Sequence, residues 1–242
     1  MPVGIIINAA AVMTGGLLGS VLGGRLGETF KENLNLVFGA CSMFMGISSI
    51  VKMENMPAVI LSVILGSVIG LSLRLEEKIN SAGKRMQVVI SRFASAPGGL
   101  EQKKSDDLLV TAIVLFCASG TGIYGSIVSG INGDESILLA KSVLDLPAAL
   151  IFACTLGTVI SFIAVPQLVI FLTLYCMAGV IFPLTTQAMI NDFKACGGLI
   201  IFVTGFRMIR VKDFPVADMI PAMILVMPLS RLWSTLILPI LS

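Results

Sequence analysis

Long apolar runs separated by short polar clusters are the dominant pattern of this chain. A helix of about 20 residues crosses a hydrocarbon core of about 30 Å, so runs of this length predict transmembrane helices. Spans are expected at 3–24, 36–51, 58–73, 108–131, a fifth that follows 137–144 and ends near 164, then 168–182, 195–206 and 216–241. The last contains three prolines, which predicts a kinked or half re-entrant segment. The pattern predicts an all-α polytopic transmembrane bundle of eight spans, with seven as the alternative.

One polar connector, residues 74–107, divides the apolar runs into blocks. It carries seven basic and five acidic side chains in 34 residues, and its first part, 76–93, has the apolar spacing of an amphipathic helix. Two shorter polar stretches, 25–35 and 183–194, are predicted to be surface linkers. The expected organisation is a three-span block over 1–73, the connector over 74–107, a second three-span block over 108–182 and the C-terminal spans over 183–242.

The two three-span blocks have the same order of elements, which predicts a 3+3 inverted repeat, because three spans reverse the direction of the next block. Each block opens with a glycine-rich span and ends with two spans joined at a proline. A shift of 106 residues brings the first set onto the second: Gly16, Gly19, Ser20, Gly24 and Gly27 onto Gly122, Gly125, Ser126, Gly130 and Gly133. A rival match, LGSVLG at 18–23 with LGSVIG at 65–70, has a shift of 47, so the glycines alone can reflect close helix packing.

Composition supports a membrane protein and makes a metal site or a nucleic-acid partner unexpected. The chain is 56% hydrophobic and 12% charged, whereas soluble domains are about 25% charged. It has no histidine, which removes the commonest metal ligand, and its five cysteines stand singly in apolar runs as packing residues. A net charge of +2 gives no reason to expect a nucleic-acid partner. The expected partner is the lipid bilayer.

The distribution of basic residues predicts how the chain is oriented in the membrane. Loops rich in Lys and Arg stay on the cytoplasmic side, so the connector is expected to be cytoplasmic. With that assumption, twelve basic residues lie in inside loops and four outside, namely Lys52, Lys141, Lys194 and Arg231. Both termini are then external.

Asp145 is the ionisable residue of greatest interest, because it borders a span in the sequence LDLPAALIF. A carboxylate within the hydrocarbon region is costly and usually functional. Asp followed by Pro147 is also an ordinary helix start, with Asp145 as the N-cap. Both interpretations stay open. Asp218, at the start of the last span, is interpreted as a partner of the basic turn 207–212.

Polar and small residues inside the first and fourth spans form a second set of candidates. Thr-Gly stretches near mid-membrane can present backbone groups to a small solute, although the same residues also permit close packing. With Asp145, the candidate substrate-binding residues are Asn8, Thr14, Gly15, Gly16, Thr121 and Gly122. The ladder of Gly15, Gly19 and Gly23 predicts close packing on another helix, in the same chain or in a homo-oligomer.

Motifs for enzymatic chemistry are missing from the sequence. It has no nucleophile–base pair, no metal-ligand spacing and no phosphate-binding loop, so we expect no enzyme and no cofactor. The leading hypothesis is a passive or ion-coupled transporter or channel for a small solute, either a small organic anion or an ion. Asp145 is its candidate for ion or proton coupling. The alternative hypothesis is a non-enzymatic structural or regulatory membrane subunit.

The opening MPVGIIINAAAVMTGGLLGSVLG, the following RLGETFKENLN and the order GISSI, LGSVIG, LRLEEKI resemble one known family. This is the YqgA/YdfK-like family of bacterial integral membrane proteins, which is classed as a domain of unknown function. The resemblance covers essentially the whole chain and carries no catalytic signature. It implies a multi-pass protein of the bacterial inner membrane and, by analogy, a role in transport.

Overall fold

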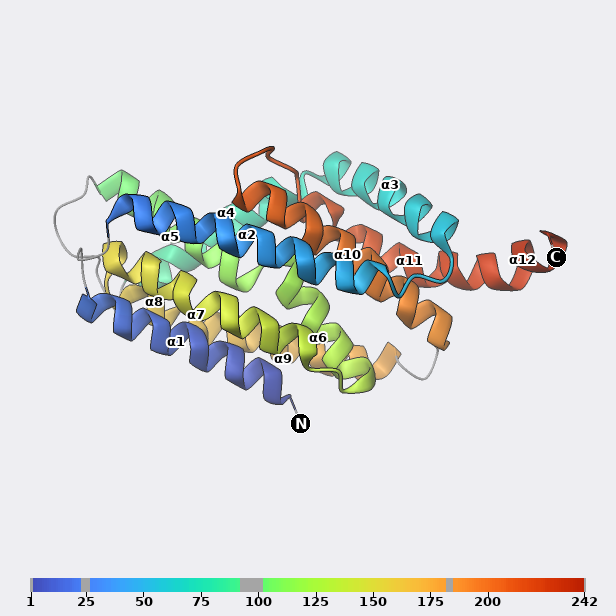
Figure 1. The fold of residues 1–242 in the computed structure, drawn as a ribbon, viewed down its shortest axis with the longest axis horizontal. Helices are drawn as coiled ribbons and strands as arrows, with labels where there is room; N and C mark the ends of the chain where they lie inside the picture. The colour runs from blue at the N-terminus through green and yellow to red at the C-terminus, as the bar shows by residue number, and fades with distance from the viewer. Residues whose placement is uncertain (1, 23–26, 92–101, 182–184, 242) are drawn as a thin grey trace. The chain divides into compact units, whose positions relative to one another are not determined.

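The computed structural model describes residues 2–22, 27–91, 102–181 and 185–241, and this part of the chain contains helices without strands (Figure 1). The helices are α1 (Val3–Leu22), α2 (Glu28–Ile50), α3 (Met56–Leu73), α4 (Leu75–Ile90), α5 (Gln102–Cys117), α6 (Gly120–Asn132), α7 (Ser136–Leu156), α8 (Val159–Phe162), α9 (Ala164–Ile181) and α10 (Gln187–Met208). The C-terminal segment consists of η3 (Ala217–Met219), α11 (Pro221–Leu232), the π-helical η4 (Trp233–Ile237) and α12 (Leu238–Leu241).

Eight segments within the described residues are long and apolar enough to cross a membrane, which confirms the predicted all-α bundle. They are Val3–Leu22, Glu32–Ile50, Met56–Leu73, Leu108–Asn132, Ser136–Leu156, Val159–Ala178, Gln187–Met208 and Ala217–Ile237. The amphipathic helix expected in the connector is α4, while Phe93 and the following ASAPGG lie outside the described residues.

Several predicted boundaries are wrong. The linker expected at 25–35 is helical from Glu28, and the linker expected at 183–194 is helical from Gln187. The fifth span begins at Ser136 rather than after 144 and ends at Leu156 rather than near 164. The proline turn expected just before 168 lies inside α9 instead. In α7 and α10 the reason is physical: the charged side chains that suggested loops are buried and have polar partners, so the helix continues through them.

The chain divides into two compact units that do not follow the order of the sequence blocks. Unit 1 comprises Met1–Asn35 and Lys78–Gly179, and unit 2 comprises Leu36–Glu77 and Val180–Ser242. The first span therefore belongs with spans four to six, and the second and third belong with the last two. The 3+3 inverted repeat stays a prediction.

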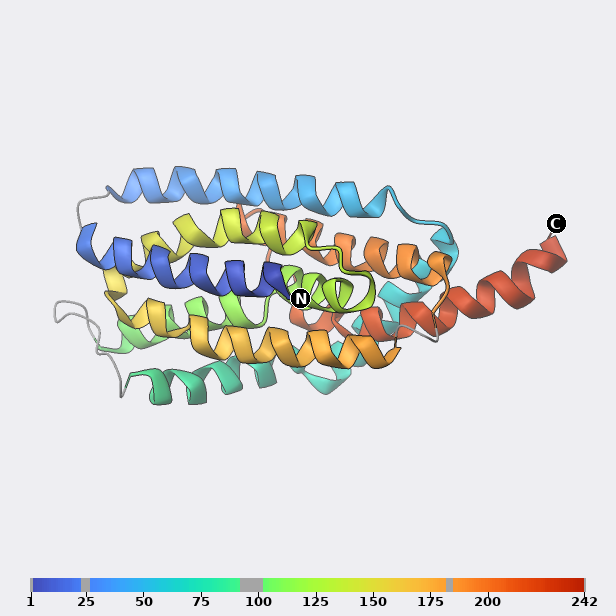
Figure 2. The same ribbon diagram turned by 90° about the horizontal axis from the view of Figure 1, so that it is seen from below.

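Close packing of α1 on α7 organises unit 1, and the two helices run side by side in both ribbon views (Figures 1 and 2). Gly15 lies against Leu146 and Ala149, and Gly19 lies against Leu150 and Ala153. A Cβ at Gly19 would lie 2.8 Å from that of Ala153, so only glycine permits this approach. The predicted packing of the glycine ladder is confirmed at positions 15 and 19, and Gly23 lies outside the described residues.

The apolar core of unit 1 joins α7 to α5 and α8. Phe116 and Phe152 meet edge to face with ring centroids 6.1 Å apart. Ala112, Leu156 and Ile160 are fully buried in the same cluster. This packing fixes the position of α7 against the helices around it.

Unit 2 contains two further glycine-mediated helix pairs. On α2, Gly46 lies against Gly198 and Phe202 of α10. On α3, Gly66 lies against Ala222 of α11. The opposite face of α3 carries a row of half-exposed apolar side chains at helical spacing: Ile60, Ile64, Val68 and Leu71.

The directions of the packed helices agree with eight spans that cross alternately. Contacts between α1 and α7 advance together along both helices, from Gly4 with Leu138 to Gly19 with Ala153, so these helices are parallel, as spans one and five must be. The α3–α11 pair is antiparallel, as spans three and eight must be, because Gly66 meets Ala222 and Gly70 meets Asp218.

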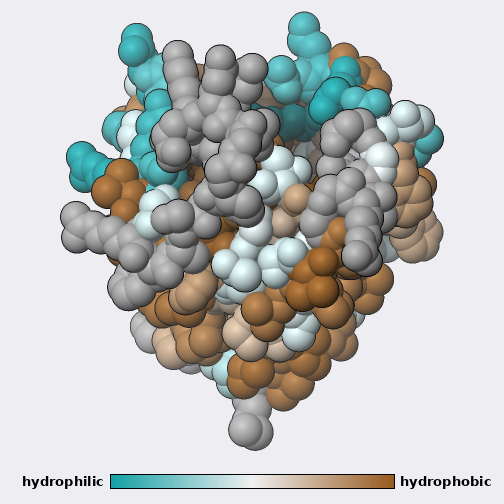
Figure 3. Space-filling model, turned by 90° about the vertical axis from the view of Figure 1, so that its left-hand side faces the viewer, coloured by the Kyte–Doolittle hydropathy of each residue, from teal (hydrophilic) through white to brown (hydrophobic). Residues whose placement is uncertain are grey.

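Apolar side chains also form much of the molecular surface. They cover a large part of the face drawn in Figure 3, where hydrophilic side chains gather along one edge. Together with the outward row on α3, this surface is suited to lipid rather than water.

Candidate functional site

A buried ion pair lies within unit 1. Lys141 and Asp145 are one turn apart on α7, and Lys141 Nζ lies 2.7 Å from Asp145 Oδ2 and 2.9 Å from Oδ1. The two side chains are only 4% and 9% exposed. A charge within a membrane span is tolerated when it has a partner, and here each charge neutralises the other.

Two amides from other helices complete the cluster. Asn8 on α1 donates through Nδ2 to Asp145 Oδ2 at 2.9 Å. Gln167 on α9 donates through Nε2 to Asn8 Oδ1 at 2.7 Å, and the same nitrogen lies 3.5 Å from Asp145 Oδ2. Neither Asn8 nor Gln167 has any exposed surface. The polar cluster, defined as Asn8, Lys141, Asp145 and Gln167, therefore joins α1, α7 and α9.

The carboxylate fixes the orientation of both amides. An ionised carboxylate only accepts hydrogen bonds, so Asn8 must turn its NH₂ group toward Asp145 and its oxygen away. Gln167 must then donate its own NH₂ group to that oxygen. Gln167 Oε1 is left buried, and no donor among the described residues reaches it. A buried acceptor without a partner is unusual and indicates a position for a ligand or a proton donor.

A break in the fourth span lies at the level of Gln167. The helix stops at Cys117 and restarts at Gly120, with Ser119 as the N-cap whose Oγ accepts from Gly122 N at 3.2 Å. Cys117 Sγ lies 4.0 Å from the carbonyl oxygen of Ile163, and Gly122 lies against the Phe171 ring. Gln167 of α9 lies four residues after Ile163, whose carbonyl accepts from its N–H at 3.1 Å, and four residues before Phe171, so it lies beside the break.

The start of α6 adds positive electrostatic character to this region. The first backbone N–H groups of a helix have no carbonyl partner within it, and they form the positive end of the helix dipole. Gln167, one turn after the Ile163 carbonyl that Cys117 Sγ approaches, has its Nε2 3.5 Å from Asp145 Oδ2. The break, the ion pair and the unpaired carbonyl of Gln167 thus belong to one region of unit 1.

Asp145 is not the N-cap that its sequence permits. Because α7 begins at Ser136, Asp145 lies within the helix, and Pro147 is an internal proline. Proline has no N–H, so the carbonyl of Val143 loses its usual helical partner one turn above. The capping interpretation is wrong, and the intramembrane interpretation fits the observed burial of Asp145.

The structure brings Asn8 and Asp145 together but distributes the other predicted residues. Thr14 is on the exposed side of α1, and its hydroxyl donates to the carbonyl of Ala10 in the same helix at 2.8 Å, so it does not join the cluster. Gly15 is covered by α7 and Gly122 by Phe171, so both serve helix packing. Gly16 lies beside Ser161, whose Oγ is buried without a partner among the described residues.

Thr121 is buried in the first turn of α6, immediately after the break, where its backbone belongs to the positive helix end. Its binding role stays a prediction.

Sequence reasoning missed two members of the cluster. Lys141 was expected in an external loop, and Gln167 was expected at the membrane interface, but both are buried. Lys141 had a signal, because it precedes Asp145 by four residues and opposite charges at this spacing meet on one helix face. No feature of the sequence distinguishes Gln167 from a glutamine at the membrane interface.

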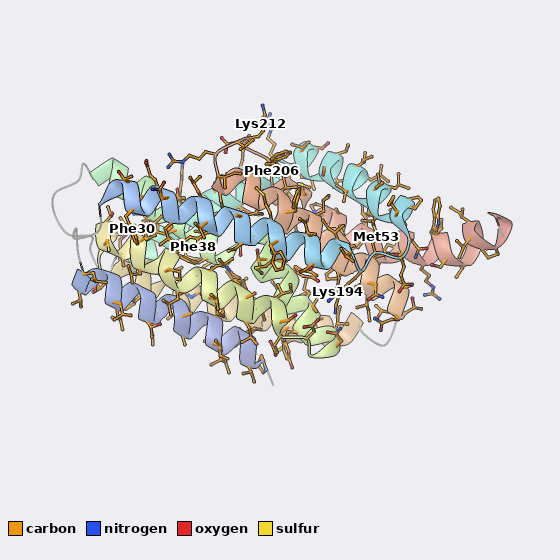
Figure 4. All side chains as sticks on the ribbon, viewed as in Figure 1. Phe30, Phe38, Met53, Lys194, Phe206 and Lys212 are labelled. Carbon is orange, nitrogen blue, oxygen red and sulfur yellow. The ribbon has the colours of Figure 1, made fainter. Side chains whose placement is uncertain are left out.

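A second buried carboxylate, Asp192 of α10, lies in unit 2. Its Oδ1 accepts from the backbone N–H groups of Glu54 and Asn55 at 2.9 and 2.8 Å. Its Oδ2 accepts from Asn55 Nδ2 at 2.8 Å and from Ser230 Oγ at 2.6 Å. These four neutral donors fill its acceptor positions and tie α10 to α11 and to the start of α3. Figure 4 labels Met53, in the turn before α3, and Lys194 on α10.

The two Asn–Asp pairs have the same separation in the sequence. Asn8 and Asp145 are 137 residues apart, and so are Asn55 and Asp192. Both residues of the second pair therefore lie 47 residues after their counterparts, the same shift that matches LGSVLG with LGSVIG. The pairs differ in chemistry: Asp145 has an ammonium partner, whereas Asp192 is satisfied by neutral donors.

Asp218 has a different partner from the predicted one. Its Oδ1 accepts from the backbone N–H of Glu76 at 3.0 Å. Arg207 of the basic turn pairs instead with Glu76, 2.7 Å from Oε1. Asp218 and Arg207 therefore do not pair as expected; both contact Glu76 at the start of α4.

Eight apolar helical segments and a charged cluster buried within them define a multi-pass membrane protein. The chain belongs to the family described as "Protein of unknown function (DUF554)", which matches residues 3–231. It is 44% identical to "Uncharacterized protein YqgA" of Escherichia coli (strain K12), over 97% of this chain and 98% of the relative. It is 23% identical to "Uncharacterized membrane protein YdfK" of Bacillus subtilis (strain 168), over 92% of this chain and 93% of the relative. No solved structure matches the chain.

Proposed function

We propose that this protein is a non-enzymatic transporter or channel of the bacterial inner membrane, passive or ion-coupled, for a small organic anion or an ion. The observation that carries the proposal is the polar cluster, a buried ion pair with two amides and an unpaired carbonyl inside apolar spans. Charges that serve packing alone are costly at membrane depth, where apolar residues would pack as well.

The broken fourth span supports the same proposal. Transporters bind solutes near mid-membrane where helices are interrupted and backbone groups face the binding site. Here the interruption at residues 118–119 lies beside Gln167, and the cluster supplies groups of both signs next to it. Asp145 is the proposed coupling residue, because it is the carboxylate of the cluster and interacts with three different side chains.

A thermal-shift screen of the purified full chain against small carboxylates, amino acids and alkali cations tests the proposal. A ligand at 100 times its Kd adds about 2.7 kcal/mol of stability. For a chain of this length that corresponds to roughly 5–10 °C in Tm. We expect a hit whose shift rises with concentration, differs from wild type in Asp145→Asn and is unchanged in Asp192→Asn. A screen without any shift, in protein that is folded by circular dichroism, contradicts the proposal.

A structural or regulatory subunit is the competing function, and it has a different requirement. Such a subunit needs a partner for its connector and no solute site. It therefore predicts that Asp145→Asn changes only the stability and assembly of the ligand-free protein. A solute-dependent shift that Asp145→Asn alters and Asp192→Asn leaves unchanged favours the transporter.

A further inference from the structure

The ion pair of the polar cluster restricts what unit 1 can bind. In the described structure one positive and one negative group, Lys141 and Asp145, neutralise each other at a position where both side chains are buried. A ligand of either sign that binds to its opposite partner leaves the other charge buried without compensation, which is strongly unfavourable. Binding is favourable when a second charge of opposite sign enters with the ligand.

We propose that the polar cluster binds a small carboxylate together with a proton, with Lys141 holding the anion and Asp145 taking the proton. This inference rests on the proposed function and names the substrate class of the same site. The bound state is again neutral. The proton from solution converts the carboxylate of Asp145 to a carboxylic acid, and the anion replaces it as the ion-pair partner of Lys141.

The unpaired Gln167 carbonyl supports the protonated state. An ionised Asp145 cannot use this acceptor, because a carboxylate has no proton to donate. A protonated Asp145 has one. Asn8 lies between the two side chains, with Nδ2 2.9 Å from Asp145 Oδ2 and Oδ1 2.7 Å from Gln167 Nε2. Rotation of both amides then lets Asn8 Oδ1 accept from the acid and Asn8 Nδ2 donate to Gln167 Oε1, which gives the buried carbonyl its missing donor.

The start of α6 supports the anion. Its first N–H groups lie beside the helix break, where they favour negative charge. Gln167, which lies beside that break, has its Nε2 3.5 Å from Asp145 Oδ2, the oxygen that Lys141 Nζ approaches at 2.7 Å. A carboxylate bound to Lys141 is therefore also attracted by the positive end of α6, whereas an alkali cation is repelled by it.

The surrounding helices offer few other groups that could take up the proton. Helices α1 and α9 contribute the neutral amides Asn8 and Gln167 to the pair. Helix α5, which packs on α7, carries the buried thiol of Cys117, and α6, which also packs on α7, carries the buried phenol of Tyr124. Both groups already carry their proton between pH 6 and 8, so a Cys117→Ala variant is a matched control that changes a neighbour of the pair and keeps its carboxylate.

The test is the pH dependence of anion binding to the purified full chain. Acetate, lactate and succinate are titrated between pH 6 and 8 by calorimetry in two buffers of different ionisation enthalpy. If one proton enters with each anion, Kd rises about tenfold per pH unit, and the buffers report one proton taken up. Cys117→Ala keeps this slope. In Asp145→Asn the slope disappears, because the amide mimics the protonated acid and leaves Lys141 unpaired at every pH.

Each other result overturns the inference. A wild-type Kd that does not change with pH shows that no proton binds with the anion. A pH slope that persists in Asp145→Asn shows that the proton binds to a group other than Asp145. The absence of binding by all three anions at pH 6 removes the substrate class. Stabilisation by alkali cations instead would overturn the inference and leave the proposed transporter intact. The wild-type proton count needs no variant, so it decides even if Asp145→Asn does not fold.

Discussion

Charge neutralisation within the Lys141–Asp145 pair makes a strong prediction about stability. The perturbation is a double-mutant cycle of Lys141→Met, Asp145→Asn and the double variant, each a change of similar volume. Removing one partner leaves the other charge buried, whereas the double variant has neither charge. We therefore expect the double variant to be more stable than the two single effects added together.

The magnitude follows from the geometry. At 2.7 Å and an effective dielectric constant of about 20, Coulomb's law gives about 6 kcal/mol of attraction between the two charges. Desolvation of both groups opposes this, and breaking a buried pair from one side typically costs about 3–5 kcal/mol. We expect single-variant losses in this range. The expected coupling energy is about 2–3 kcal/mol, at the upper end for residues in one network.

The assay is reversible unfolding in mixed micelles, followed by circular dichroism, for all four proteins. The control cycle uses Arg74 and Glu77, a 3.8 Å pair at helical spacing whose side chains are 74% and 71% exposed. This exposed pair should show no measurable coupling. Single variants of Lys141 and Asp145 whose effects simply add, or a cycle that matches the exposed control, would refute the reasoning.

Three further predictions concern packing, the second carboxylate and topology. Gly19→Leu should destabilise by about 1–3 kcal/mol in the same assay through overpacking, while Gly27→Leu, where a new Cβ meets nothing within 4 Å, should have the stability of wild type. Asp192→Asn should lower stability by about 1–3 kcal/mol, because an amide cannot accept from all four donors, and unchanged stability would contradict its anchoring role. In a cysteine-free background, a cysteine at position 84 should be protected from an impermeant reagent and one at 132 labelled, and the reverse pattern would overturn the orientation.

Hydropathy and small residues contain most of the information about this fold. The apolar runs predict the spans, because crossing a bilayer requires length and apolar surface and little else. The packing of Gly15 and Gly19 on another helix is also predictable, since glycine removes the steric barrier to close approach. The partner helix, α7, is not predictable from this pattern, because many helices can accept such a face.

The polar cluster was only partly predictable, for a reason that applies to buried charges generally. A lysine in a hydropathy profile is the same whether it marks a loop or neutralises a carboxylate within a helix, so Lys141 was assigned to the wrong environment. Gln167 depends on long-range pairing with Asn8, which no local pattern encodes. The equal separation of the two Asn–Asp pairs was visible in the sequence but had meaning only once both contacts were known.

Solute uptake into sealed proteoliposomes tests the central claim, that the polar cluster of unit 1 is the site of transport, most directly. The solute is the strongest hit of the thermal-shift screen, and wild type, Asp145→Asn and Asp192→Asn are reconstituted at equal density and orientation. We predict that wild type and Asp192→Asn accumulate the solute under an imposed ion gradient and that Asp145→Asn does not. Gradient-driven uptake by Asp145→Asn at the wild-type rate would contradict the role assigned to the cluster, and liposomes impermeable with all three proteins would contradict transport itself.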